Sequence, residues 1–326
     1  MVGRRALLAA AIALCAALSA AMAPQACAQA YPDKPIKMIV PFLPGGPIDT
    51  MARLTATDLG TRLGQQVIVE NRPGAGSTIG FKAAATAEPD GYTLLFGSSG
   101  SLGVAPALYP SLDVDPLKHF TAVATTSLLP HVMVVGPTVP AKTLAEFIAY
   151  SKSNKDGLLL GIPGTGSVSH LYGLALAAKT GAKLTFVPYR GDAPARLDLL
   201  AGNIHGVAST PDFGLIAEGK ARLIGSTGTK RWPQTPDVPT FAEAGYPDLV
   251  GFIVWGFAVP AGTPDDIVRI LNEATNRALQ SERVKRVMVD NAYFVSGGTP
   301  EALGQAFDKQ ISEFTEIMKA GAIKFE

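Results

Sequence analysis

Short apolar segments alternate with helical segments along most of this 326-residue chain. Each apolar segment spans only a few residues and is bounded by glycine, proline or polar residues, which is typical of strands buried on both faces. Strands that alternate with helices favour βα units around largely parallel sheets, so we expect an α/β protein with two compact lobes. The clearest strand candidates are residues 67–69, 93–96, 132–135, 158–162, 184–187 and 223–225, and a further strand is expected at 204–208.

Capping residues mark the ends of the predicted helices. An apolar stripe runs from Ile48 to Leu63, and Gly64 is suited to close that helix in a left-handed conformation. Thr143 and Glu146 have the spacing of a capping box. The other predicted starts are the pair Thr263 and Asp266, ahead of a helix near 264–280, and Thr299-Pro300, ahead of a helix towards Met318.

The N-terminal segment has the features of a secretory signal. Arg4 and Arg5 precede an apolar, alanine-rich run over 6–23, and Ala28-Gln29-Ala30 fits the small-x-small cleavage pattern. We therefore expect residues 1–30 to be a signal peptide and the exported, mature chain to begin near Tyr31. An alternative cleavage site, Ala26-Cys27-Ala28, lies just upstream.

Charge and cysteine content exclude several classes of protein. The chain has 28 Lys and Arg against 27 Asp and Glu, and loss of Arg4 and Arg5 makes the balance 26 against 27. This near-neutral balance argues against a nucleic-acid partner. Cys15 and Cys27 both leave with the signal, so no disulfide or thiolate metal site is expected. No later apolar run is long enough for a membrane span, so the mature protein is not expected to be membrane-spanning.

Residues 36–49 read as a buried strand that enters a glycine turn and then a helix. Gly45 and Gly46 allow a tight turn, and Pro47 suits the first position of a helix. The unpaired N–H groups at such a helix start, together with the helix dipole, favour a carboxylate or phosphate. An ordinary turn that binds nothing is the alternative. The candidate ligand-binding residues here are Phe42, Leu43, Pro44, Gly45, Gly46 and Asp49.

A second loop, residues 161–170, follows the same logic of strand, glycine turn and helix start. Its hydroxyls lie beside exposed amides, a combination that can hold a carboxylate without a fixed positive charge, although any one serine can simply cap the helix. A third polar edge follows the strand at 93–96. The candidate residues are Thr165, Gly166, Ser167, Ser169 and His170 in the second loop, and Ser98 and Ser99 in the third.

Two aspartates are the most informative carboxylates. Asp49 either caps free amides at the helix start or orients the loop and meets an amino group or water on the ligand. Asp212 follows the predicted 204–208 strand and is placed to face the same cleft from the second lobe, with Phe213 as an apolar neighbour.

No motif indicates catalysis or a bound cofactor. The segment Gly74–Gly80 has GxGxxxG spacing rather than the GxGxxG of dinucleotide sites, which leaves an exported oxidoreductase as a weak alternative. The histidines are scattered without ligand spacing, so no metal and no cofactor are expected. No nucleophile is paired with a base, and we expect a protein that is not an enzyme.

Ordered motifs along the whole mature chain resemble the periplasmic solute receptors of tripartite tricarboxylate transporters, also called Bug receptors. The segments that carry the resemblance are Tyr31–Ile36, the PFLPGGPID loop at 41–49, Val69–Gly76, Pro89–Leu94, GTGSVSHL at 164–171, Val187–Gly191, Asp237–Thr240, Glu243–Gly245 and Pro260–Pro264.

The resemblance implies a two-lobed periplasmic-binding-protein fold of type II, with a mostly parallel sheet flanked by helices in each lobe and a ligand cleft between the lobes. It implies a monomeric receptor that captures a small carboxylate through amides, hydroxyls and water and delivers it to a membrane permease. A receptor that feeds a sensor kinase is the alternative output. The expected limits are 31–135 with 250–326 for the first lobe and 136–249 for the second.

Three departures from the family pattern affect the distal half of the predicted pocket. Arg196 occupies a helix site that is more often apolar, and Ile162-Pro163 replaces small residues before the GTGS turn. The segment 202–210 also differs from the usual continuation. We therefore expect the half of the pocket that determines selectivity to differ, with Phe42, Leu43, Ile162 and Phe213 making it rather apolar.

Overall fold

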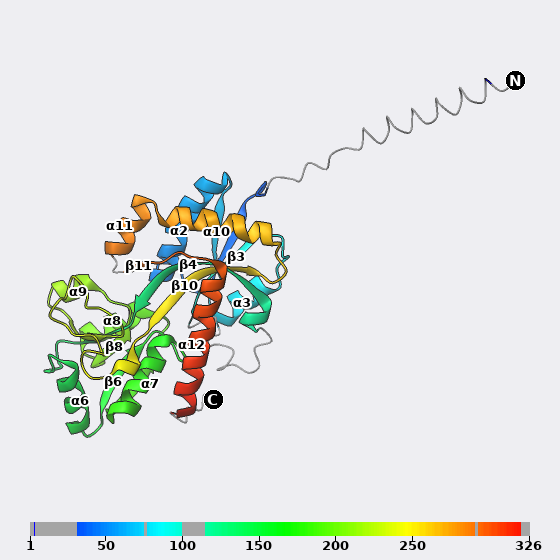
Figure 1. Ribbon diagram of the computed structural model, residues 1–326. Helices are drawn as coiled ribbons and strands as arrows, with labels where there is room; N and C mark the ends of the chain where they lie inside the picture. Colours follow the sequence, from blue (N-terminus) through cyan, green and yellow to red (C-terminus); the bar gives the residue numbers. More distant parts are fainter. Residues whose placement is uncertain (1–2, 4–30, 75–76, 100–114, 291–292, 321–326) are drawn as a thin grey trace. The chain divides into compact units, whose positions relative to one another are not determined.

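Two mixed β-sheets flanked by helices form the frame of the protein in a computed structural model (Figure 1). The structure describes residues 3, 31–74, 77–99, 115–290 and 293–320. Contacts divide the chain into a unit Met1–Asp33 and a unit Lys34–Glu326, which holds both sheets. The predicted signal residues 4–30, with the cleavage point at Ala30, lie outside the described residues.

The first sheet has six strands in the order β11-β4-β10-β3-β1-β2. β1 lies between β2 and β3 and is parallel to both, as expected for βα units. α2 and α10 contact each other on one face of the sheet, and α3 and α12 cover the other face (Figure 1). The strands are β1 Ile36–Val40, β2 Val67–Asn71, β3 Thr93–Ser98, β4 Phe120–Pro130, β10 Phe252–Pro260 and β11 Phe294–Val295.

The second sheet has five strands in the order β7-β6-β8-β5-β9. β6 is parallel to β7 and β8, so the carboxyl ends of these three strands share one edge. One apolar cluster packs α6 and α7 against the sheet, and another packs α8 and α9 against its other face. The strands are β5 Val132–Val135, β6 Leu158–Ile162, β7 Leu184–Pro188, β8 Gly206–Ser209 and β9 Arg222–Ser226.

The prediction of mostly parallel sheets is wrong, because both sheets are mixed. In the first sheet β10 runs antiparallel to β3 and β4, and β11 runs antiparallel to β4. In the second, β5 runs antiparallel to β8 and β9. The cause is the chain path: β4 leaves the first sheet and β10 returns to it beside β4, so the two must run in opposite directions.

The described helices begin and end largely where capping residues predict. Gly64 closes α2 with a left-handed φ of 70°, and Thr143 accepts the Glu146 N–H at the start of α6. Thr263 does not cap α10, because its hydroxyl donates to the Pro260 carbonyl instead. The helices are α2 Pro47–Leu63, α3 Thr78–Ala85, α5 Pro116–His119, α6 Leu144–Ser153, α7 Val168–Thr180, α8 Asp192–Ala201, α9 Phe213–Ala217, η3 Pro247–Leu249, α10 Asp265–Leu279, α11 Glu282–Asp290 and α12 Pro300–Ala320.

Thr227 ties together the segments that cross between the sheets. Its hydroxyl accepts the His131 N–H at 2.8 Å and donates to the Gly251 carbonyl at 2.6 Å. Its backbone N–H donates to the His131 carbonyl, and its carbonyl accepts the Gly251 N–H. The outgoing and returning chains are therefore bonded to one residue, which restricts how the two sheets move at this point.

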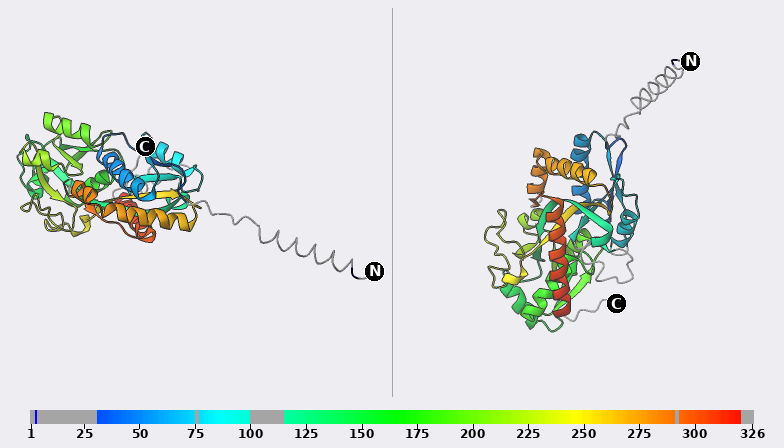
Figure 2. Two further views of the ribbon diagram at one scale, coloured as in Figure 1. Left: turned by 90° about the horizontal axis from the view of Figure 1, so that it is seen from above. Right: turned by 45° about the vertical axis from the view of Figure 1, so that its right-hand side comes forward.

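The chain passes from the first sheet to the second between Pro130 and Val132, and the return is complete at Phe252. β5, which the predicted limits assign to the first lobe, belongs to the second sheet. The limits of the lobes themselves stay a prediction. The long α12 contacts β4 and β10 of the first sheet and α7 of the second, so it lies alongside both (Figures 1 and 2).

Candidate ligand-binding site

The predicted binding loops lie at the carboxyl ends of parallel strands. β1 and β3 lead into the loops that contain residues 42–46 and Ser99, and β6 and β8 lead into residues 163–170 and 210–212. Parallel strands end at one edge of a sheet, which is where open α/β sheets place ligands. Each sheet therefore presents one edge that carries predicted site residues.

The start of α2 presents backbone donors. Gly45 has a left-handed φ of 84°, and Gly46 precedes the helix without a side-chain cap. The first intrahelical bond is the one from the Thr50 N–H to the Gly46 carbonyl at 2.9 Å. By helix geometry the N–H groups of Ile48 and Asp49 have no intrahelical acceptor, and Pro47 has no N–H. This is the geometry that favours an anion.

The Asp49 carboxylate is buried, with 3% of the residue exposed, and it bonds to its own loop. It accepts the Gly45 N–H at 2.9 Å, the Arg53 Nε–H at 3.0 Å and the Asn71 side-chain amide at 2.7 Å. Burial alone would raise the pKa of Asp49, but the bonds from Arg53, Gly45 and Asn71 outweigh it and the pKa is lowered. Asp49 is therefore an ionised group that fixes the turn.

Asn71, at the end of β2, completes this cluster. Its amide also donates to the Phe42 carbonyl at 3.1 Å, and its oxygen accepts from Arg53 at 2.7 Å. Phe42 is half-buried, whereas Leu43, Pro44 and Gly45 are exposed. Sequence reasoning missed Arg53 and Asn71 as members of the site. The Arg53 signal was its position one turn after Asp49, but nothing local connects Asn71 to the loop.

Ser98 and Ser99 follow β3 and are both buried. The Ser99 hydroxyl is fully buried and accepts the Val254 N–H of β10 at 3.0 Å. Ser98 lies opposite Trp255 in the same sheet. The contact of Ser99 is thus with the sheet, and binding of a ligand by either serine stays a prediction.

The second loop is held by hydrogen bonds at the start of α7. Gly166 adopts a left-handed φ of 74°, and the Ser167 hydroxyl caps the helix by accepting the His170 N–H at 3.2 Å. The Gly166 N–H donates to Nδ1 of His170 at 3.1 Å. Thr165 is exposed. Hydrogen bonds therefore hold the loop in place, and Ser167 caps the helix, which was the alternative to ligand binding for a single serine.

Two buried histidines bond to residues of this loop. Burial lowers the pKa of His170 to about 4, so His170 is neutral and its Nδ1 accepts the Gly166 N–H. Burial lowers the pKa of His131 to about 3, and Nδ1 of His131 bonds to the Ser169 hydroxyl at 2.9 Å. Ser169 thus connects α7 to the crossing segment at His131, a partnership that sequence reasoning missed.

Asp212 and Phe213 lie at the start of α9. Asp212 caps that short helix by accepting the Leu215 N–H at 3.2 Å and also accepts from Arg196 at 3.1 Å. Phe213 is half-buried and meets Trp232 edge to face at 5.4 Å. The structure therefore places Asp212 in an ion pair, and Phe213 belongs to the apolar cluster of the second sheet.

The predicted site residues thus fall into separate bonded groups. Asp49, Gly45 and Phe42 join one group, Gly166, Ser167 and His170 a second, and Ser169 bonds to His131. Ser99 bonds within the first sheet, and Asp212 bonds to Arg196. A ligand shared by these groups stays a prediction.

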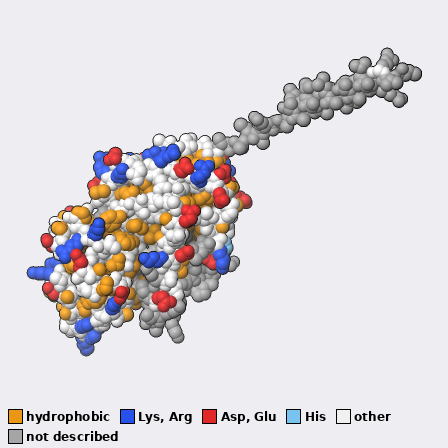
Figure 3. All heavy atoms as spheres, in the orientation of Figure 1, with side chains coloured by type: hydrophobic (Ala, Val, Ile, Leu, Met, Phe, Trp, Pro, Cys, Tyr) orange, Lys and Arg blue, Asp and Glu red, His pale blue; other side chains and the backbone are white. Residues whose placement is uncertain are grey.

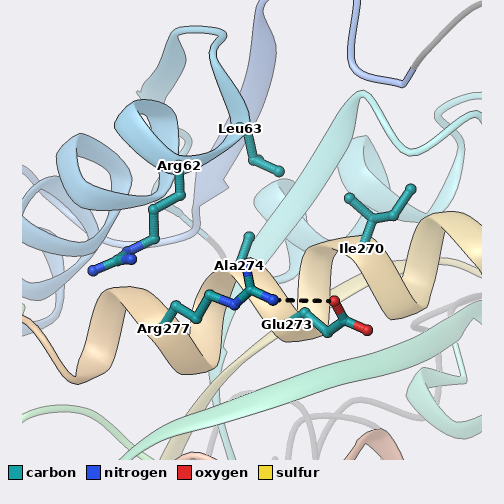
Figure 4. A pocket seen from close by; sticks show the side chains of 6 residues that line it. All are labelled: Arg62, Leu63, Ile270, Glu273, Ala274 and Arg277. Atoms are coloured by element: carbon teal, nitrogen blue, oxygen red, sulfur yellow. Dashed lines mark ion pairs between the residues drawn. The ribbon is translucent and has the colours of Figure 1, made fainter.

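A cavity of about 330 Å³ lies elsewhere, between the end of α2 and α10. Arg62 and Leu63 line it from α2, and the Arg277 guanidinium points towards Glu273 on α10 (Figure 4). Helix α2 has 17 residues, so at 1.5 Å per residue the cavity lies about 25 Å from the Asp49 loop.

Acidic and basic side chains are interspersed on the face shown in Figure 3.

The described residues contain neither a cluster suited to a metal ion nor a helix suited to a membrane span. No group of three or more His, Cys, Asp and Glu side chains is arranged to hold a metal ion there. Among the helices of the described ranges, none is both long and apolar enough to cross a bilayer.

The chain matches the family model described as tripartite tricarboxylate transporter family receptor over residues 51–320. It is 37% identical over 287 residues to Protein BugT of Bordetella pertussis, with 86% of each chain covered. These matches place the chain in that family of solute-binding receptors.

Two solved structures support the same assignment. The periplasmic binding protein BugD superposes with a TM-score of 0.83 at 33% identity, over 90% of this chain and 99% of BugD. MatC of Rhodopseudomonas palustris, solved with bound malate, superposes with a TM-score of 0.81 at 35% identity, over 88% of this chain and 99% of MatC. The chain therefore has the two-lobed periplasmic-binding-protein fold, as the resemblance implied.

Proposed function

We propose that this protein is an extracytoplasmic receptor that captures a small organic carboxylate between its two lobes and delivers it to a tripartite tricarboxylate-type membrane permease. The observation that carries the proposal is the start of α2. Its turn is fixed by a buried, ionised Asp49, while the helix presents N–H groups that have no intrahelical acceptor. Family membership and a malate-bound relative support a carboxylate as the guest.

The proposal includes the predicted site residues and the location. The loop 42–49 contacts the ligand from the first lobe, and Thr165–His170 contacts it from the second. Ser98, Ser99, Asp212 and Phe213 also surround the ligand. Ligand binding favours the closed arrangement of the lobes, and the permease recognises that arrangement. The protein acts in the periplasm after removal of the signal peptide, as a monomer, without catalysis and without a cofactor.

Thermal-shift measurements with a panel of small monocarboxylates and dicarboxylates test this proposal. A ligand that binds only the folded state stabilises it by about 2.7 kcal/mol at a hundredfold excess over its dissociation constant. We expect at least one acid to raise the melting temperature in a concentration-dependent manner. The matched control is the neutral amide of each acid, the monoamide of a monocarboxylate or the diamide of a dicarboxylate, which keeps the shape of the acid without its charge. A panel in which no carboxylate stabilises the protein would refute the proposed function.

Delivery requires a separate test. Proteoliposomes that contain the cognate permease should accumulate the stabilising acid only when this receptor is added. Tight binding without receptor-dependent uptake would leave ligand capture standing and refute the delivery step.

A further inference from the structure

An aromatic contact joins the two sheets outside the segments that cross between them. Phe294 of β11 stacks on Trp232, with ring centroids 5.1 Å apart and 17° between the ring planes. Phe294 belongs to the edge strand of the first sheet, whereas Trp232 belongs to an apolar cluster of the second. This interlobe stack is therefore a contact between the sheets that the crossing backbone does not supply.

The backbone fixes Phe294 at the end of the first sheet that leads to the crossing. Phe294 lies opposite Leu128, just before β4 ends at Pro130. Directly after β11, the Ser296 N–H donates to the Thr126 carbonyl at 3.2 Å. The Phe294 residue itself is 43% exposed. Its ring is thus carried by a bonded strand but lies outside the apolar core, so the ring can be removed without a core cavity.

Trp232 is held firmly on the second sheet, in the segment that follows β9. Only 3% of the residue is exposed, and Phe213 meets its ring edge to face at 5.4 Å. The neighbouring Arg231 forms an ion pair with Glu243 at 2.9 Å, which restrains the same segment. The indole therefore presents a fixed face to Phe294.

Separation of the sheets at this point would expose apolar surface on both rings. A stacked aromatic pair contributes more than the apolar area that it buries. The Trp232 Nε1–H is buried, and it finds no acceptor among the described residues. Water would reach this N–H if the sheets separated, which offsets part of the lost stacking. The contact is therefore favourable but reversible.

Two further relatives indicate which arrangement of the lobes contains the stack. Rpa4515 of R. palustris, solved with adipate, superposes with a TM-score of 0.85 at 29% identity over 90% of this chain. A TctC solute binding protein from Polaromonas, solved with no ligand, superposes with a TM-score of 0.71 at 28% identity over 89% of this chain. The structure that contains the stack is therefore closer to the adipate-bound relative.

We infer that the stack of Phe294 on Trp232 favours the closed arrangement of the lobes before a ligand arrives and thereby strengthens the binding of an acid. Closing the lobes costs the ligand part of its binding free energy, so a contact that already favours closure raises the apparent affinity. Neither ring has to touch the ligand for this effect. The gain in affinity rests on the proposed function, whereas the effect on the arrangement of the lobes does not.

Small-angle X-ray scattering and calorimetric titration of Phe294→Ala test the two effects. Without ligand, we expect a larger radius of gyration than in the native protein. With malate, succinate and adipate as probes, we expect the affinity for each acid that the native protein binds to fall about tenfold, or about 1.4 kcal/mol. Phe294→Tyr keeps the ring and should retain both native values. The matched control is Ile68→Ala, at an exposed apolar side chain on β2 at the opposite edge of the first sheet, and it should change neither value.

Equal ligand-free radii of the native protein and Phe294→Ala would overturn the inference. Unchanged or tighter binding of an acid by Phe294→Ala would overturn it as well. If no carboxylate binds the native protein, the proposed function fails, and the ligand-free radii still decide whether the stack holds the lobes together. Circular dichroism of each variant separates an altered arrangement from loss of folding.

Discussion

Replacement of Asp49 by alanine should weaken both the loop and the binding of a carboxylate. The change removes three accepted bonds, from Gly45 at 2.9 Å, Asn71 at 2.7 Å and Arg53 at 3.0 Å. Hydrogen bonds to a charged group are each worth about 1.5–3 kcal/mol, and the half-exposed Arg53 adds only about 0.5 kcal/mol. Water can reach the freed donors of exposed Gly45 and half-buried Asn71, which reduces the cost of the lost bonds. We therefore expect the free energy of unfolding to fall by about 2–3 kcal/mol.

For a protein of this size that loss corresponds to a melting temperature lower by about 3–5 °C. Ligand binding would also have to fix the released turn again, and fixing one residue's backbone costs about 1–2 kcal/mol. We therefore expect affinity for the best carboxylate to fall about tenfold or more. The assays are a thermal melt of the free protein and calorimetric titration of the acid.

The control is Asp58→Ala on the same helix, which breaks the ion pair with Arg283 far from the loop. It should lower stability slightly and leave affinity unchanged. If Asp49→Ala binds the acid as tightly as the native protein, Asp49 serves only the stability of α2 and the reasoning is refuted. If both variants lose affinity equally, the effect is not specific to the loop.

Three further predictions concern the second loop and the crossing segments. Ser169→Ala should lower the free energy of unfolding by about 1–3 kcal/mol, because Nδ1 of buried His131 loses its partner. The control Ser153→Ala, at an exposed helix hydroxyl, should be nearly neutral, and urea melts measure both variants. Gly251→Ala should fail to fold or melt far lower, since a Cβ there would lie 1.4 Å from the Tyr172 hydroxyl oxygen; a normal melt would contradict this. In the folded protein the pKa of His131 is about 3 and that of His170 is about 4, below the ordinary histidine value of 6.5. The unfolded chain therefore binds more protons below pH 6.5, and stability should fall as the pH drops from there. A urea midpoint that stays constant from pH 6.5 to 4 would contradict this.

Local signals in the sequence predicted the elements that depend on neighbouring residues. The strand at 36–40, the helix that Gly64 ends and the cap at Thr143 all follow from periodicity and from the conformational preferences of single residues. The predicted strands at 158–162 and 184–187 also match β6 and β7, apart from one residue at an end. These features need no knowledge of the rest of the fold.

The features that the sequence did not reveal are tertiary. β4 and β10 are long strands that pair with each other across more than a hundred residues of chain, and their apolar runs contain no local signal for that pairing. The bond between Ser169 and His131 likewise joins residues 38 apart. Thr263 had a plausible capping partner in Asp266, but the nearby Pro260 carbonyl competes for its hydroxyl. Local pattern reasoning misses such outcomes because a distant or competing partner decides them.

The surroundings of Asp49 resolve an apparent conflict in the proposed anion-binding loop, which itself contains a carboxylate. A free carboxylate at the start of α2 would compete with the ligand for the same N–H groups and would repel it. Here its oxygens are occupied by Gly45, Arg53 and Asn71, and Arg53 offsets its charge. The carboxylate thus uses one loop amide to fix the turn, while the N–H groups of the first helical turn keep their preference for an anion. Capture of a carboxylate at this position, as proposed, is compatible with Asp49 because the oxygens of Asp49 are already bonded to Gly45, Arg53 and Asn71.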